Sequence, residues 1–184
     1  MRIFRRLPLL IIILLAACQA AAPQPQPTDP GGATMTFILN SPAFKEGETI
    51  PTIHTCEGQD RSPELRWSDA PANARSFVLI VDDPDAPGGT FTHWVLFDIP
   101  AATRQLAEAE TAIGAAGRGD FGRAGYGGPC PPRGGGSHRY FFKVYALDVA
   151  SLNLKQGAAR RDVETAMKGH ILAQAQLMGR YERR

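Results

Sequence analysis

The stretch GYGGPCPPRGGGSHRYFFKVYALD, residues 125–148, joins a loop of glycine, proline and one cysteine to a dense apolar segment. From Arg139 to Leu147 the apolar residues alternate, and side chains of a strand point alternately to its two faces. The segment is therefore predicted to be a strand with one buried face. That face carries Tyr140, Phe142, Val144 and Ala146. His138 lies on the same face directly before Arg139, so the loop brings a histidine to the edge of a core.

The rest of the domain is typical of short strands separated by Pro/Gly turns. Including the segment above, strands are predicted at Met35–Leu39, Glu64–Trp67, Ser76–Val81, Thr92–Ile99 and Arg139–Leu147. Ser76–Val81 is a continuous apolar run, which favours a central strand covered on both faces. Helices are predicted at Arg160–Lys168 and His170–Met178, each followed by a glycine that can end a helix. The pattern predicts a mainly β fold, an all-β core with a few peripheral and C-terminal helices.

The N-terminus has the features of a bacterial lipoprotein signal. A basic start with three arginines precedes the apolar run Leu7–Leu15, and Leu15-Ala16-Ala17-Cys18 fits the lipobox. We expect residues 1–17 to be removed and Cys18 to be lipidated. A plain signal peptide or a short membrane anchor is the alternative, although the run has about half of the roughly 20 residues that a spanning helix needs. Gln19 rather than Asp after the cysteine favours the outer membrane, on its periplasmic side, in a two-membrane bacterium.

Residues 18–34 are rich in Pro, Ala and Gln, a composition that favours an extended tether. The folded domain is predicted to span residues 35–184, enough for one core. Of the 20 Lys and Arg residues, three lie in the signal segment, and the others nearly balance the 18 Asp and Glu residues. No basic block stands out in the domain, so nucleic acid is not an expected partner.

Two histidines stand at the starts of predicted strands, each beside a loop rich in Pro and Gly. Alternation places His93 on the same face as Val95, Phe97 and Ile99. If that face and the face of His138 are core faces, both rings point inward at the rim of the fold. A single histidine is more often a structural donor than a ligand, but two beside such loops favour a site.

The loop before His93, Asp82–Gly89, carries three carboxylates in four positions: Asp82, Asp83 and Asp85. A turn accounts for one of them, because Asp-Pro sequences initiate turns and Asp accepts backbone N–H bonds. Three carboxylates at the end of a buried strand repel one another unless cations or donors are close. The two histidines are the natural partners, so acids and histidines are predicted to lie together.

Five blocks of sequence in this order resemble the phosphatidylethanolamine-binding protein family, in its bacterial Raf-kinase-inhibitor-like branch of the YbhB/YbcL type. They are CEGQDRSPELRW, DDPDAP, THWVLFDIP, the 125–148 stretch and GHILAQAQLMGRYER. The resemblance covers roughly Phe37 to Arg183. It implies a β-sandwich with a small pocket that binds anions such as phosphate and phospholipid head groups.

The resemblance also implies which residues bind the ligand. They are Asp83, Asp85, His93, Tyr126, Gly128, Pro131, Pro132, His138 and Tyr140. In this interpretation both histidines donate N–H groups to phosphate oxygens, and Tyr140 donates its hydroxyl. Asp83 would orient a histidine or meet an ammonium group, while glycines and prolines shape the loop over the anion.

Two cysteines remain after Cys18, and an exported chain permits a disulfide between them. Cys56 and Cys130 are either bridged or two separate buried thiols, and a bridge would tie the pocket wall to an earlier segment. His54 could join His93, His138 or Cys130 around a metal, but these residues lack the tight local spacing of zinc ligands. We therefore expect no metal and no cofactor, and a structural role for His54.

Three classes of function fit these features. The first is a membrane-anchored binding protein for a phosphate-containing small molecule or phospholipid head group. The alternative is a regulator or inhibitor of another protein, such as a kinase or protease, although no partner surface is evident. A small hydrolase is the third, but the sequence holds no Gly-x-Ser-x-Gly elbow or phosphate-binding Walker loop. Ser137 would face away from His138 on a strand, so we expect no enzyme and no catalytic residues.

Overall fold

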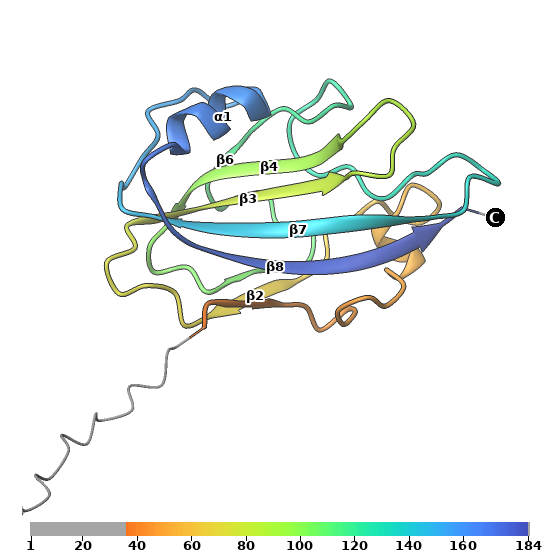
Figure 1. Cartoon of the computed structure of the whole chain (residues 1–184), viewed down its shortest axis with the longest axis horizontal. Helices are drawn as coiled ribbons and strands as arrows, with labels where there is room; N and C mark the ends of the chain where they lie inside the picture. Colours follow the sequence, from red (N-terminus) through yellow and green to blue (C-terminus); the bar gives the residue numbers. More distant parts are fainter. Residues whose placement is uncertain (1–35, 184) are drawn as a thin grey trace, which may run out of the picture. The chain divides into compact units, whose positions relative to one another are not determined.

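Two antiparallel sheets and one α-helix form the described part of the chain, residues 36–183, in a computed structural model (Figure 1). The larger sheet has the order β6-β4-β3-β7-β8: Ala115–Ala116, Phe91–Pro100, Ser76–Asp83, Ser137–Leu147 and Ile171–Glu182. The smaller sheet has the order β1-β2-β5: Ile38–Asn40, Leu65–Ser68 and Gln105–Leu106. A 3-10 turn, η1, spans Thr52–His54, and the helix α1 spans Arg160–Met167. The mainly β fold predicted from the sequence is confirmed.

The large sheet is covered on both faces, as Figure 1 shows with α1 on one side and β2 on the other. Between the sheets lies a core that includes Leu65, Trp67, Phe77, Leu79 and Phe142. On the opposite face, α1 contributes Val163 and Met167 to a second core with Val78, Ile80 and Phe97. All eight residues of β3 are buried, which confirms the prediction of a central strand covered on both faces.

The last predicted helix, His170–Met178, is wrong, because this segment forms most of strand β8. The strand pairs with β7 from Ser137↔Glu182 to Leu147↔Ile171. Its Ala, Gln, Leu and Met residues have good helix propensity, but pairing along a long neighbour outweighs a weak local preference. Gly179 does not end a helix. A Cβ at this position would collide with the Ile50 side chain, so its role is close packing.

Two β-bulges in β4 reverse the faces that simple alternation predicts. Val81 pairs with Trp94 and Asp82 with Thr92, which leaves His93 as the extra residue. A second register shift lies farther along, where Asp98 has a φ of 53°. As a result Trp94, Leu96 and Ile99 face the core between the sheets, while Val95 and Phe97 face the helix side. The predicted shared face of His93, Val95, Phe97 and Ile99 is therefore wrong.

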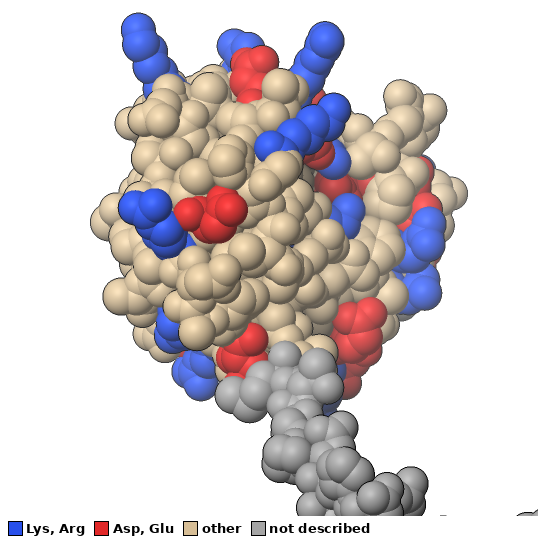
Figure 2. Space-filling model, turned by 60° about the vertical axis from the view of Figure 1, so that its left-hand side comes forward, with Lys and Arg blue, Asp and Glu red and all other residues tan. Residues whose placement is uncertain are grey.

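The predicted signal segment, Cys18 and the whole tether lie outside the described residues. No helix within residues 36–183 is long and apolar enough to cross a membrane. On the face that Figure 2 shows, Lys and Arg side chains alternate with Asp and Glu, and uncharged surface separates them. That face therefore carries no continuous charged patch of either sign.

Phe77 tests the core between the sheets, because its ring contacts those of Phe37 and Trp67 and is fully buried. We expect Phe77→Ala to lower the free energy of unfolding by about 3–5 kcal/mol, since a buried cavity replaces the ring. Ile171→Ala, at an exposed position of the large sheet, should cost less than about 1 kcal/mol. Denaturant unfolding measures both, and equal losses would contradict this arrangement of the core.

Candidate functional site

A cavity of about 190 Å³ opens at the end of the large sheet where β3 ends and β4 and β7 begin. Its lining consists of Asp83, Ala86, Pro87, Phe91, His93, Phe121, Cys130, Pro131, Pro132 and His138. A larger hollow of about 420 Å³, bounded by Thr49, Glu57 and Glu182, has no histidine in its lining. The smaller cavity is therefore the candidate site, because both predicted histidines and Asp83 meet there.

Asp83 and His138 form the floor of the cavity. His138 Nδ1 donates to Asp83 Oδ2 over 2.7 Å, and the two side chains are only 7% and 4% exposed. Asp83 Oδ1 accepts a second hydrogen bond from the backbone N–H of Asp85 at 2.8 Å. Both oxygens of the carboxylate thus have donors, as a buried charge requires. The predicted partnership of acid and histidine is confirmed for this pair.

The bulge turns His93 toward Tyr140, in the wall beside this floor. The ring nitrogen Nδ1 of His93 donates to the carbonyl oxygen of Gly127 at 2.8 Å, while the Gly127 N–H donates to the His93 carbonyl at 3.1 Å. A carbonyl only accepts, so Nδ1 carries the proton and the Nε2 atom of a neutral ring is an acceptor. Burial lowers the pKa of His93, and Gly127 and Asp83 raise it by less. The neutral ring is thus the favoured form near pH 7.

Tyr140 supports the His93 ring from below. The two rings meet edge to face with centroids 5.1 Å apart. Burial raises the pKa of Tyr140, and the charge of nearby Asp83 raises it further. The fully buried hydroxyl nevertheless forms no hydrogen bond with any residue of the described chain. Tyr140 is not among the residues that line the cavity, so its visible role is to position His93.

Aromatic and proline side chains form the walls, and the sequence did not point to the aromatic ones. Phe91 and Phe121 stack edge to face at 4.8 Å, and Phe121 also meets the His93 ring at 5.4 Å. Phe121 is 42% exposed at the mouth. Pro131 and Pro132 line the cavity as predicted. Phe91 could have been found from its place beside His93, whereas nothing local marks Phe121.

Tyr126 and Gly128 lie near the site but fasten its wall instead of lining the cavity. The Tyr126 hydroxyl donates to the His54 carbonyl at 2.7 Å, and the Gly128 N–H donates to Asp60 Oδ1 at 2.6 Å. A Cβ at Gly128 would collide with the His54 carbonyl, so glycine is required there. Together these contacts hold the loop against the segment that follows η1.

Asp85 is held by Arg139 and is not among the residues that line the cavity. The Arg139 guanidinium donates to both carboxylate oxygens, at 2.9 and 2.6 Å, and the Arg139 backbone N–H adds a third bond at 2.9 Å. These hydrogen bonds hold the pKa of Asp85 at about 2. The geometry therefore gives Asp85 a role in fixing the loop after β3.

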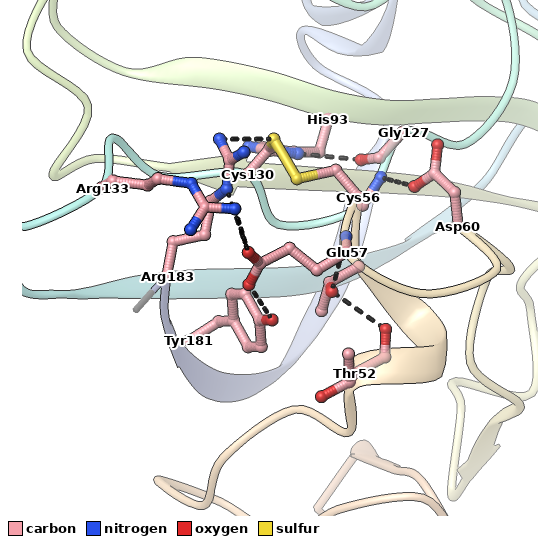
Figure 3. Close-up of a disulfide and its surroundings, with 12 residues drawn as sticks. Thr52, Cys56, Glu57, Asp60, His93, Gly127, Cys130, Arg133, Tyr181 and Arg183 are labelled. Carbon is pink, nitrogen blue, oxygen red and sulfur yellow. Dashed lines mark hydrogen bonds and ion pairs between the residues drawn. A yellow bond between two sulfur atoms is a disulfide. The ribbon is translucent and has the colours of Figure 1, made fainter.

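The Cys56–Cys130 disulfide is present, with the two Cα atoms 5.4 Å apart (Figure 3). It ties the cavity wall to the segment after η1, where the Cys56 N–H also donates to the Pro129 carbonyl at 3.2 Å. His54 is buried and its Nδ1 donates to the Arg61 carbonyl at 3.0 Å, which is a structural role. Within residues 36–183, no group of three His, Cys, Asp or Glu side chains could hold a metal ion.

Comparison with known proteins identifies relatives of the whole domain. Residues 40–182 match the family model described as phosphatidylethanolamine-binding protein. A UPF0098 protein of Aquifex aeolicus is 58% identical over 158 residues, which cover 83% of this chain and 91% of that protein. A UPF0098 protein of Pyrococcus horikoshii is 48% identical over 161 residues, covering 84% and 81%.

Two crystal structures share the fold. A putative phosphatidylethanolamine-binding protein homologue from Chlamydia trachomatis is 40% identical, with a TM-score of 0.77 over 82% of this chain and 99% of the other. YbcL of Escherichia coli, described as a new member of the mammalian family, is 34% identical. Its TM-score is 0.75 over 80% of this chain and 99% of that one.

The lowered pKa of His93 links stability to pH. In the unfolded chain this ring binds a proton near pH 6.5, whereas in the folded chain it binds one only at lower pH. The contribution of His93 to the free energy of unfolding is therefore fully present above that pH and is lost as pH decreases. We expect His93→Asn, whose amide can still donate to Gly127, to flatten the decline in melting temperature between pH 7.5 and 5.5. The control His170→Asn removes an exposed ring and should keep the wild-type slope. Identical slopes for all three proteins would exclude a buried neutral His93.

Proposed function

The chain belongs to the phosphatidylethanolamine-binding protein family, and we propose that it is a binding protein for phosphate-bearing ligands or phospholipid head groups. The observation that carries the proposal is the pair of histidines in the cavity. Each has its Nδ1 engaged, with Gly127 or Asp83, and neither Nε2 hydrogen-bonds to a described residue. Two fixed rings thus keep one nitrogen each for a ligand.

The two nitrogens suit a phosphate group in different ways. Nε2 of His138 donates to a phosphate oxygen when the ring is an imidazolium, with Asp83 balancing its charge. Nε2 of neutral His93 accepts, so it suits the hydroxyl of a monoprotonated phosphate or an ammonium group. This modifies the expectation that both histidines donate. The two rings therefore match a ligand in which one oxygen accepts a hydrogen bond from His138 and another donates one to His93.

The size and walls of the cavity favour a small head group. Its volume of about 190 Å³ is below the roughly 300–1,000 Å³ that is usual for drug-sized ligands. Phe91, Phe121 and the prolines give the cavity apolar walls, and polar contacts are stronger in apolar surroundings than in water. A larger ligand would therefore insert only its phosphate end and leave the remainder at the exposed Phe121.

We propose binding without turnover. Among the lining residues there is no serine, threonine or lysine, and Cys130 is bonded to Cys56. Ser137 is exposed and lies opposite in phase to buried His138 on β7. The carboxylate of Asp83 already accepts two hydrogen bonds, which leaves it poorly placed to act as a base.

We also propose that lipidated Cys18 anchors the domain to the cell envelope through the tether 18–34. The disulfide supports an exported location, because oxidising compartments preserve such bonds. Incorporation of radiolabelled palmitate in cells tests the anchor. The label should be lost in Cys18→Ser, and retention of the label would contradict this anchor.

Calorimetric titration of the full-length chain with phosphate and with phosphoethanolamine tests the binding function. Saturable binding is expected, and His138→Ala or His93→Ala should weaken it by about tenfold or more, because a hydrogen bond to a charged group contributes about 1.5–3 kcal/mol. His170→Ala, at an exposed histidine outside the cavity, is the matched control and should stay within about twofold of wild type. Absence of binding, or an equal loss in His170→Ala, would refute the proposed site.

A further inference from the structure

The Cys56–Cys130 disulfide belongs both to the cavity wall and to the protein surface. Cys130 lines the cavity and is half-buried, whereas Cys56 is exposed and lies outside the lining. An external thiol can therefore approach Cys56 without entering the ligand site. The bond spans 74 residues of sequence and joins two segments that are otherwise held by hydrogen bonds and ion pairs.

A guanidinium group contacts the sulfur of Cys130. Arg183 Nη1 lies 3.6 Å from Cys130 Sγ, and Arg183 Nε lies 3.4 Å from Glu57 Oε1. The Tyr181 hydroxyl donates to the other oxygen of Glu57 at 2.8 Å, so the carboxylate that holds Arg183 is itself fixed (Figure 3). Arg133 adds a second cation on Glu57 at 3.2 Å. Of the two cysteine sulfurs, Cys130 Sγ is therefore the one in contact with a guanidinium group.

We propose that Cys56–Cys130 is a thiol–disulfide exchange site whose reduction by a dithiol protein loosens the wall of the ligand cavity. A thiolate of the dithiol attacks Cys56 Sγ, the Cys56–Cys130 bond breaks, and Cys130 leaves as a thiolate beside Arg183. The second thiol of the reductant then attacks the reductant sulfur that is bonded to Cys56 in the mixed disulfide. Its proton passes to solvent, and Cys56 is released as a thiolate. Two electrons reach the protein, and the reductant becomes a cyclic disulfide.

The charge distribution sets the direction of attack. A leaving thiolate departs faster when its negative charge is stabilised, and a neighbouring arginine provides that stabilisation. Arg183 lies at Cys130, which makes Cys130 the better leaving group. The exposed Cys56 is thus the sulfur that receives the attack, which agrees with its accessibility.

Reduction weakens one part of the wall in particular. Hydrogen bonds of Tyr126, Gly128 and Pro129 hold the first half of the loop to the segment after η1. Pro131 and Pro132 follow Cys130, and the disulfide is the covalent bond that keeps this half in place. Its loss should widen the cavity on the side of the prolines and lower ligand affinity, an effect that rests on the proposed binding function.

The test uses the full-length chain and two readouts that need no ligand. Alkylation kinetics measure how fast a dithiol protein reduces the bond, and trypsin cleavage after Arg133 measures mobility of the wall. We expect Arg183→Gln to slow reduction by about two- to fivefold, as loss of a partly exposed charge interaction implies. The control Arg180→Gln, an exposed arginine on β8, should match wild type. Reduction should accelerate the cleavage after Arg133 at least about tenfold.

A third readout links the bond to the ligand, by titrating phosphate into oxidised and reduced wild type. Weaker phosphate binding by the reduced form supports the proposal. Equal affinity of the two forms overturns the idea that the disulfide controls the cavity. If the oxidised chain binds no phosphate, the binding function fails while the kinetic and trypsin readouts still decide the exchange site. Equal reduction rates in Arg183→Gln and Arg180→Gln, or a rate of trypsin cleavage that does not change after reduction, would overturn the proposed exchange site. A Cys56→Ser/Cys130→Ser chain that reproduces the reduced pattern with unchanged circular dichroism would exclude general unfolding.

Discussion

A buried hydrogen bond between His138 Nδ1 and Asp83 Oδ2 joins the end of β3 to the start of β7, and the rest of the site depends on it. A carboxylate this deeply buried is tolerated only with partners for its charge. That requirement fixes the His138 ring, which lines the cavity. It also fixes the backbone of the following loop through the Asp85 N–H.

The acids Asp82 and Asp83 at the end of β3 and Asp85 just after it do not share one partner, because they point to different sides of the sheet. Asp82 lies on the helix side, where it pairs with Lys143 at 3.0 Å and Arg160 at 3.1 Å. Asp83 faces the cavity and His138, while Asp85 turns outward to Arg139. Each carboxylate therefore has its own cation or donor, and the repulsion expected for the cluster is removed by geometry.

A continuous apolar run was sufficient to predict β3. Period-two alternation predicted β7 and placed His138 and Tyr140 on its inner face. It failed in β4, because a bulge inserts His93 as an extra residue and no local pattern marks a bulge. It failed again for β8, whose residues favour helix until the neighbouring β7 offers a complete row of hydrogen-bond partners. The disulfide was left open by the sequence, since the distance between Cys56 and Cys130 is a property of the fold alone.

In the site, too, some residues could be predicted from the local sequence, whereas the roles of others depend on contacts that only the fold creates. Asp83, His93, His138 and the two prolines lie together as predicted, because β3 ends, β4 and β7 begin, and the loop before β7 passes, at one end of the sheet. Tyr126, Gly128 and Asp85 lie close by but support the walls, which depends on partners such as Asp60 and Arg139 far away in sequence. Phe121 reaches the mouth only because the chain folds back over β4.

The account rests on two histidines that keep their Nε2 atoms for a ligand, and nitrogen NMR of histidine-labelled full-length chain tests this most directly. We predict that neutral His93 is protonated at Nδ1, and that phosphate shifts the Nε2 signals of His93 and His138 saturably. The signals of His54 and His170 should stay unchanged. A His93 protonated at Nε2, or phosphate shifts that are equal for all four rings, would contradict the account.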